Sequence, residues 1–163
     1  MMTFKNSVLA ALVMVSTLLV NAQEPSTSYG VKGGLNLTFF TIDQQNLGSY
    51  STSETGFYGG VFVTFPIDDF LIIQPEVLYI SVGDFNFLNV PLYANYEVAK
   101  KLHLLAGPSV NYFFDFFTGK LKVGADISSS YEISKILEAH VKFTLGLDEL
   151  APNGLFFGLG LKL

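Results

Sequence analysis

Residues 136–147 read ILEAHVKFTLGL and alternate strictly between two kinds of side chain. In an extended backbone, one face carries only apolar residues: Leu137, Ala139, Val141, Phe143, Leu145 and Leu147. The other face carries polar residues and one glycine: Glu138, His140, Lys142, Thr144 and Gly146. A period of two is typical of a β-strand, and about ten residues is the length with which a tilted strand crosses a bilayer. This stretch therefore predicts one strand of a membrane β-barrel.

The composition agrees with a barrel in a membrane. Hydrophobic residues make up 50% of the 163 residues and charged residues only 14%, which is little charge for an ordinary soluble surface. Beyond the N-terminal segment, no apolar run approaches the ~18 residues of a spanning helix. The net charge is −5, and an acidic chain without a basic patch argues against nucleic acid as a partner. Because the chain has no cysteine, disulfides and thiolate metal sites are excluded.

The N-terminal segment, residues 1–22, is typical of a secretory signal peptide. Lys5 supplies a positive charge, residues 8–20 are apolar, and Val20-Asn21-Ala22 suits cleavage after Ala22. The alternative is an uncleaved membrane anchor, for which the apolar stretch is short. We therefore expect a single mature domain, residues 23–163.

Seven further stretches show the same alternation. Together with the first they predict eight strands, at 29–39, 56–65, 70–80, 87–98, 101–114, 120–133, 136–147 and 154–163. Short turns separate some strands, and longer connections are expected at 41–55, 81–86, 115–119 and 148–153. An even number of strands, with short turns at one end and longer loops at the other, is the layout of outer-membrane barrels. Pro75, Pro91 and Pro108 fall inside predicted strands, where we expect bulges or shifted strand boundaries.

The alternation does not by itself say which face points inwards, because a soluble lipocalin-like barrel buries its apolar face. The glycines favour the opposite arrangement. Glycine suits the narrow lumen of an eight-stranded barrel better than an exposed strand face, and eight glycines share the polar face: Gly30, Gly34, Gly60, Gly107, Gly124, Gly146, Gly158 and Gly160. The sequence therefore predicts an all-β fold, an eight-stranded antiparallel up-and-down transmembrane β-barrel with its apolar face towards lipid.

Aromatic residues gather near the predicted strand ends, as in the two aromatic girdles of membrane barrels. We expect one girdle near the longer loops, formed by Phe39, Phe40, Phe57, Tyr58, Tyr79, Phe85, Phe87, Phe113, Phe114, Phe116 and Phe117. The other lies near the short turns and contains Tyr29, Phe65, Phe70 and Tyr96. The alternative is that these rings are ordinary core and turn residues.

Several stretches resemble the PorT-type outer-membrane β-barrel domain of bacteria, over nearly all of the mature chain. They are GVKGGLNLT (30–38), GFYGGVFVTFPI (56–67), LIIQPEVLYI (71–80), FLNVPLYANYEV (87–98), LLAGPSVNY (104–112) and GLGLKL (158–163). The resemblance implies a barrel and a membrane, and it makes the prolines of QPE, VPL and AGP family features. It implies no single activity. The chain ends in Leu163, whereas many such barrels end in an aromatic residue.

Charged side chains and both histidines are predicted to face the lumen. The set is Lys32, Glu76, Glu97, His103, Lys122, Asp126, Glu132, Glu138, His140, Lys142 and Lys162. Histidine beside carboxylates could bind a metal or exchange protons. The other interpretation is a charge-paired network that fills the barrel, because buried charges need partners of opposite sign. No metal-ligand spacing is present, so we expect the structural network, with no catalytic residue, metal or cofactor.

We therefore expect a non-enzymatic barrel of the bacterial outer membrane with a packed, non-conducting lumen and a structural or interaction role. Its partners would be membrane lipids, the outer-membrane insertion machinery, and an extracellular or envelope protein bound through the loops. One alternative is an accessory subunit of an outer-membrane secretion or adhesion system. The other is a lipid-modifying enzyme or small-ligand carrier. The enzyme would need a nucleophile beside a base near the lipid-accessible rim, but Ser109, Ser128 and Ser130 are predicted to face the lumen.

Overall fold

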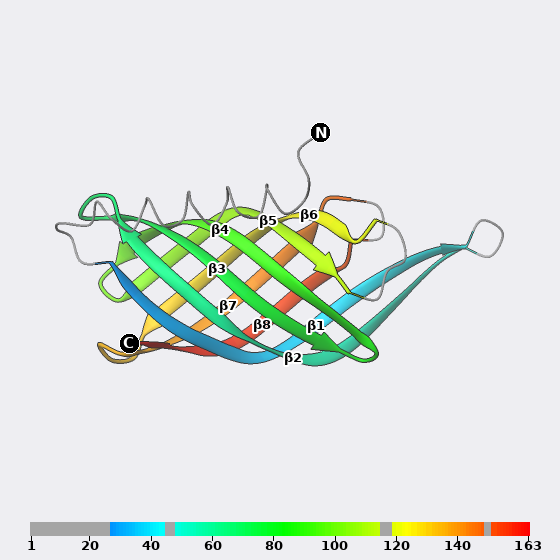
Figure 1. Cartoon of the computed structure of the whole chain (residues 1–163), viewed down its shortest axis with the longest axis horizontal. Helices are drawn as coiled ribbons and strands as arrows, with labels where there is room; N and C mark the ends of the chain where they lie inside the picture. The colour runs from blue at the N-terminus through cyan, green and yellow to red at the C-terminus, as the bar shows by residue number, and fades with distance from the viewer. Residues whose placement is uncertain (1–26, 45–47, 115–118, 149–150) are drawn as a thin grey trace, which may run out of the picture.

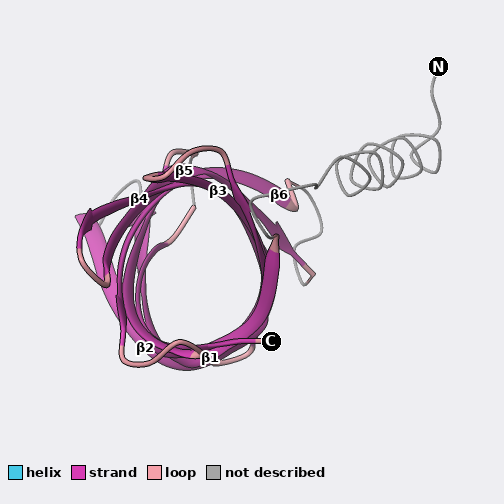
Figure 2. Ribbon diagram, turned by 90° about the vertical axis from the view of Figure 1, so that its left-hand side faces the viewer, coloured by secondary structure: helices cyan, strands magenta, loops and turns pink. Residues whose placement is uncertain are grey.

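The chain forms a closed barrel of eight antiparallel strands in sequence order, so the predicted fold class and strand number are confirmed (Figures 1 and 2). The computed structural model describes residues 27–44, 48–114, 119–148 and 151–163, and for residues 40–44 and 48–51 it describes the backbone. The strands are β1 (Ser28–Gln44), β2 (Gly48–Pro66), β3 (Leu71–Val82), β4 (Phe85–Ala99), β5 (Leu102–Phe113), β6 (Leu121–Glu132), β7 (Leu137–Gly146) and β8 (Asn153–Lys162). The segment assigned to a signal peptide lies outside the described residues. Among the described residues, no helix is long and apolar enough to cross a membrane.

The β1–β2 hairpin is the largest departure from the prediction. Residues 41–55 were expected to be a loop, but β1 continues to Gln44 and β2 begins at Gly48. The register pairs Phe39 with Ser53 and Gln44 with Gly48. The hairpin therefore projects past the ends of the other strands, as Figure 1 shows at its right-hand side. The prediction failed because serine and threonine, although polar, fit an extended strand that no longer needs an apolar face.

The two ends of the barrel differ in the way the strands are joined. At the turn end, the N–H groups of Phe70 and Leu71 donate to Asp68 Oδ1 at 2.8 Å each, which closes the β2–β3 turn. Ser28 and Leu163 lie at this end too, since Ser28 pairs with Thr64 and the Leu163 N–H donates to the Tyr29 carbonyl. The other end is the loop end. The connection predicted at 81–86 exists but is shorter than predicted, because β3 and β4 leave only a tight turn with Gly83 at a φ of 54°.

The three prolines within strands leave the register unchanged, so the bulges or shifted boundaries expected there do not occur. The β3–β4 partners Pro75↔Leu92 and Leu78↔Asn89 belong to one register, although the rungs between them are missing. In the β4–β5 pair, the shift lies instead between Glu97 and Ala99. A proline lacks the N–H that a ladder needs. The ladder therefore loses local rungs while the strand continues.

The barrel wall places its apolar rows outside and its polar rows inside, as predicted. Exposed side chains include Leu35, Val61, Leu92, Ile127 and Leu159. Buried polar and charged side chains face the lumen: Lys32, Asn36, Thr38, Thr64, Gln74, Glu76, Asn89, Asn95, His103, Ser109, Asn111, Asp126, Ser128, Ser130, Glu138, His140, Lys142 and Thr144. In water this arrangement would expose a broad apolar surface, and in a bilayer it is the stable one.

The predicted aromatic girdle at the loop end is partly wrong. Tyr58, Phe87 and Phe113 are buried in the lumen, and Phe85 packs against them. Outward-facing rings remain at this end at Phe39, Phe57, Tyr79 and Phe114, and at the turn end at Tyr29, Phe70 and Tyr96. The side chains of Phe40, Phe116 and Phe117 lie outside the described residues. The error arose because rings at strand ends were assigned to the lipid interface without regard to the side of the strand they occupy.

Candidate functional site in the barrel lumen

Lys32 lies at the centre of one group of lumen charges. From β1 its ammonium donates to Glu76 Oε1 on β3 at 2.6 Å, and it lies 3.8 Å from Glu138 Oε1 on β7. Gln74 Nε2 donates to the same Glu76 oxygen at 2.8 Å. The ammonium also stands 5.0 Å from the centre of the Phe62 ring, within the range of a cation–π contact. One cation thus links three strands across the lumen.

Asp126 lies at the centre of a second group. Its carboxylate on β6 pairs with the Lys142 ammonium at 2.8 Å. Ser109 Oγ donates to Asp126 Oδ1 at 2.8 Å, and the Tyr93 hydroxyl donates to Oδ2 at 3.3 Å. Lys142 also donates to the amide oxygen of Asn89. Because both charges are buried, their pairing and these hydrogen bonds are what make their presence in the lumen tolerable.

The third group lies at the turn end. The Asn95 amide group makes two hydrogen bonds. Its Nδ2 donates to Gln74 Oε1 at 2.8 Å, and its Oδ1 accepts from His103 Nδ1 at 3.0 Å. This assigns the proton of the histidine to Nδ1. His103 Nε2 lies 3.8 Å from Glu132, which also pairs with Lys162. Through Gln74 this group joins the Lys32 group, so that a polar network runs from the mid-lumen to the turn end.

His140 pairs with a phenol instead of a carboxylate. The Tyr58 hydroxyl lies 2.5 Å from His140 Nε2, across the lumen from β2 to β7. A Cβ at Gly158, the register neighbour of His140, would meet that hydroxyl and the Gly33 carbonyl oxygen. Glycine is therefore required here by close approach. His140 Nδ1 has no partner among the described residues.

An apolar cluster closes the lumen towards the loop end. It consists of Tyr58, Leu78, Ile80, Val82, Phe87, Phe113 and Phe156. Phe87 stacks on Phe113 with centroids 4.6 Å apart, and Tyr58 meets Phe156 edge-on at 5.3 Å. Leu78, Ile80, Val82 and Phe113 are fully buried. These side chains form a buried apolar layer on the loop-end side of the charged groups.

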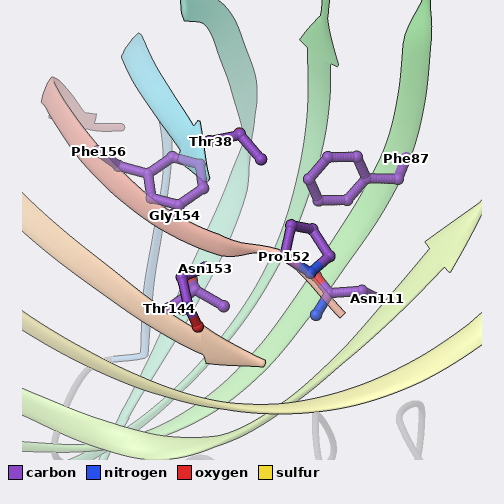
Figure 3. Close-up of a pocket in the computed structure, with 8 residues that line it drawn as sticks. All are labelled: Thr38, Phe87, Asn111, Thr144, Pro152, Asn153, Gly154 and Phe156. Carbon is purple, nitrogen blue, oxygen red and sulfur yellow. The ribbon is translucent and has the colours of Figure 1, made fainter. Parts of the chain in front are cut away.

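The cavities in the described part of the lumen are small. Figure 3 shows one at the loop end, of about 10 Å³, between Thr38, Phe87, Asn111, Thr144, Pro152, Asn153, Gly154 and Phe156. That is room for one water molecule, and Thr144 Oγ1 is a buried polar atom there with no hydrogen-bond partner among the described residues. A second cavity, of about 140 Å³, lies at the turn end and is lined by the third charge group together with Ser28, Thr64 and Ser130.

Most of the predicted lumen residues come together in these groups. Glu97 is half-buried at the turn end, next to His103 in the register, and forms no ion pair with another described residue. The Lys122 side chain reaches the loop end near Gly119. The sequence reasoning missed the amides of Asn89 and Asn95. Their position on the polar face was the available signal.

The acidic and serine side chains of the lumen are largely engaged in ion pairs and hydrogen bonds. Within the described ranges, no group of three or more acidic or histidine side chains could hold a metal ion. Ser109 donates to Asp126, and Ser128 donates to the Val141 carbonyl at 3.0 Å, so neither is poised against a histidine. Ser130 is paired in register with both His103 and His140, but its hydroxyl makes no hydrogen bond to them.

Solved structures with this architecture belong to small transmembrane barrels. A barrel from the de novo design of transmembrane β-barrels is 18% identical, with a TM-score of 0.54, covering 86% of this chain and 98% of its own. Ail, the attachment invasion locus protein of Yersinia pestis, is 10% identical with a TM-score of 0.54, covering 85% and 100%. Ail has also been solved with the heparin analogue sucrose octasulfate. Neisserial surface protein A is 13% identical with a TM-score of 0.51, covering 85% and 99%.

The chain therefore has the fold of a small outer-membrane β-barrel. No protein-family model and no curated protein matches the sequence. The resemblance to the PorT-type domain accordingly stays a prediction.

Proposed function

We propose that this protein spans the bacterial outer membrane, after cleavage near Ala22, as a small barrel that conducts nothing and acts through molecules bound at its loop end. The observation that carries the proposal is the filled lumen. Paired charges occupy its middle and turn end, and seven apolar side chains close it towards the loops. The exposed apolar rows of the wall fit a hydrocarbon environment, which supports the membrane location.

In this proposal the charge groups serve the barrel itself. Each joins side chains from several strands, so together they hold the wall in one register and keep water from passing. The absence of catalytic activity is part of the proposal, and it is supported by Ser109 and Ser128, whose hydroxyls donate to partners other than histidine. A small-ligand carrier is less favoured, because the turn-end cavity among the lumen charges has only about 140 Å³, well below the ~300 Å³ at which ordinary ligand pockets begin.

The interaction role has support of its own in the β1–β2 hairpin, which extends past the other strands at the loop end. An accessory subunit of a secretion or adhesion system is a special case of this role, in which the bound molecule is another envelope protein. The partners would further include membrane lipids around the wall and the insertion machinery during assembly.

Because the chain has no native cysteine, single cysteines can test which end faces outwards. Ser53→Cys lies on the hairpin and Lys100→Cys in a turn at the other end, and both positions are exposed. A thiol reagent that cannot cross membranes should label Ser53→Cys on intact cells, and Lys100→Cys only after the outer membrane is permeabilised. Labelling in the reverse order, or of both equally in intact cells, would refute the proposal.

A further inference from the structure

The hairpin carries open sheet edges in an otherwise closed barrel. The β1–β8 pairing ends at Phe39↔Asn153, and the β2–β3 pairing ends at Gly56↔Val82. Beyond those points, residues 40–44 of β1 pair only with β2, and residues 48–55 of β2 pair only with β1, among the described strands. Alternate residues of each strand therefore direct backbone N–H and C=O groups away from the hairpin, where no described strand receives them.

These edges lack several of the protections that natural sheets use. Lysine, proline, bulges and short edge strands discourage the addition of a further strand. Between residues 40 and 55 the sequence contains no lysine and no proline, and the β1–β2 register runs without a shift from Ser28 to Gln44. Of the two edges, the β2 edge is longer, because β2 leaves β3 at Gly56 and continues back to Gly48.

The charge around the β2 edge says what kind of strand would fit. The Glu54 carboxylate lies against the β3–β4 turn at Gly83, and the next residue of that turn, Asp84, is exposed. The hairpin also contains Asp43. The sequence from residue 33 to residue 99, which includes the hairpin, contains no lysine or arginine. The base of the β2 edge is therefore acidic.

We propose that the β2 edge from residue 48 to residue 53 binds an extended, lysine- or arginine-bearing segment of a partner protein as an added strand. Backbone hydrogen bonds supply the binding, and cationic side chains reach Glu54 and Asp84. A second copy of this hairpin is disfavoured as the occupant because it brings the same negative charges. A sulfated polyanion of the kind seen with Ail is disfavoured for the same reason. The inference rests on the proposed interaction role.

The test uses the full mature chain refolded in detergent micelles, so it does not depend on orientation in cells. The probe is a synthetic ten-residue peptide with lysine and valine in alternation. We expect it to bind and to slow amide hydrogen exchange at least about tenfold at alternate residues of 48–53, with no change in β5 or β6. A peptide with glutamate in place of lysine should not bind. Equal binding of both peptides, or protection elsewhere, would overturn the proposal.

Backbone methylation separates strand addition from simple charge attraction. Methylating every second amide of the peptide removes the donors on one of its edges, and moving the methyl groups by one residue removes those on the other. One methylated peptide should lose binding at least tenfold, which corresponds to about 1.4 kcal/mol, while the other keeps it. If both peptides bind equally well, the contact is not a β-ladder.

Variants of the protein complete the test. Thr52→Pro and Ser53→Pro remove neighbouring N–H groups that point to opposite sides of β2, so one should lose peptide binding with the hairpin intact. Glu54→Gln should weaken binding, and Glu97→Gln at the other end is the matched control without effect. If a proline variant fails to fold, the two methylated peptides still test whether the peptide binds as an added strand. Self-association through the hairpin in the absence of peptide would overturn the choice of occupant. If the peptide does not bind but the cysteines are labelled in the expected order, the proposed strand addition is refuted and the proposed function is not.

Discussion

The lumen is filled in two ways, by paired charged side chains in one region and by apolar side chains in another, and the two regions are stabilised differently. The charged filling, around Lys32 and Asp126, consists of groups that are unfavourable when buried alone and acceptable in pairs. The apolar filling, around Leu78 and Phe113, consists of groups that each gain from burial. The difference teaches that removal of one side chain should act differently in the two places. In the charged filling the loss depends on the partner left behind, and in the apolar filling it depends on the space left behind.

The largest effect is expected from Asp126→Asn. This change leaves the Lys142 ammonium buried without a carboxylate, and breaking a buried pair in this way costs about 3–5 kcal/mol. Urea unfolding of the refolded barrel in lipid vesicles measures the change. The control is the double variant Asp126→Asn with Lys142→Met, which removes both charges and should recover most of the stability. A double variant as unstable as the single one would contradict the pairing account.

Next comes Leu78→Ala in the apolar filling. Leu78 is fully buried, and loss of its side chain should lower the free energy of unfolding by about 3 kcal/mol through lost burial and a cavity. Unlike the charged site, no second substitution of a polar neighbour should restore it. The matched control is Leu92→Ala on the lipid-facing wall, where lipid fills the space and the change should be smaller. Equal losses at both positions would argue against a packed lumen.

Gly158→Ala tests the boundary between the two fillings. The added methyl would meet the Tyr58 hydroxyl and the Gly33 carbonyl oxygen, so we expect a loss of about 1–3 kcal/mol from overpacking. Gly59→Ala is the control, because a Cβ there would lie 3.8 Å from the Lys32 carbonyl oxygen, in ordinary contact. The same unfolding measurement applies, and a neutral Gly158→Ala would mean that Tyr58 and His140 can readily move.

The smallest effect is expected at Asp68, in a turn outside both fillings. The N–H groups of Phe70 and Leu71 donate to its carboxylate and lower its pKa. The contribution to stability is therefore present above the ordinary carboxyl pKa and is lost as pH falls through the lowered value. Asp68→Ala should be less stable than the native chain at pH 7 and equal to it at strongly acid pH. Asp69→Ala is the control, and a difference that persists in acid would contradict the assignment.

The barrel could be predicted from the sequence because every strand of the wall follows the same pattern, with apolar side chains outwards and mostly polar side chains inwards. Each strand separates lipid from lumen, so period-two alternation gave the eight strands and the side on which residues such as Leu92 and Glu76 lie. The rule fails where the surroundings change. At 41–55 the hairpin has left the wall, so polar residues on both faces were taken for a loop.

The lumen itself was predicted in outline only. Residues 77–82, VLYISV, are apolar on both faces, which was the available signal that the lumen near the loop end is dry. The pairing of Lys142 with Asp126 depends on the stagger between β6 and β7, where Asp126 faces Thr144 in the register and Lys142 faces Ser128. No local pattern sets that stagger. The charged residues could therefore be listed from the sequence, but their partners could not.

Single-channel recording of the refolded protein in planar lipid bilayers tests the filled lumen most directly. With Lys32, Asp126 and their partners paired, and with Leu78, Phe87 and Phe113 closing the path, we expect no stable current steps at any salt concentration. A Leu78→Ala, Phe113→Ala double variant shows whether the apolar filling is the seal, since it should admit intermittent current. Reproducible steps from the native chain that scale with salt would contradict the account, because they require a continuous aqueous path through the lumen.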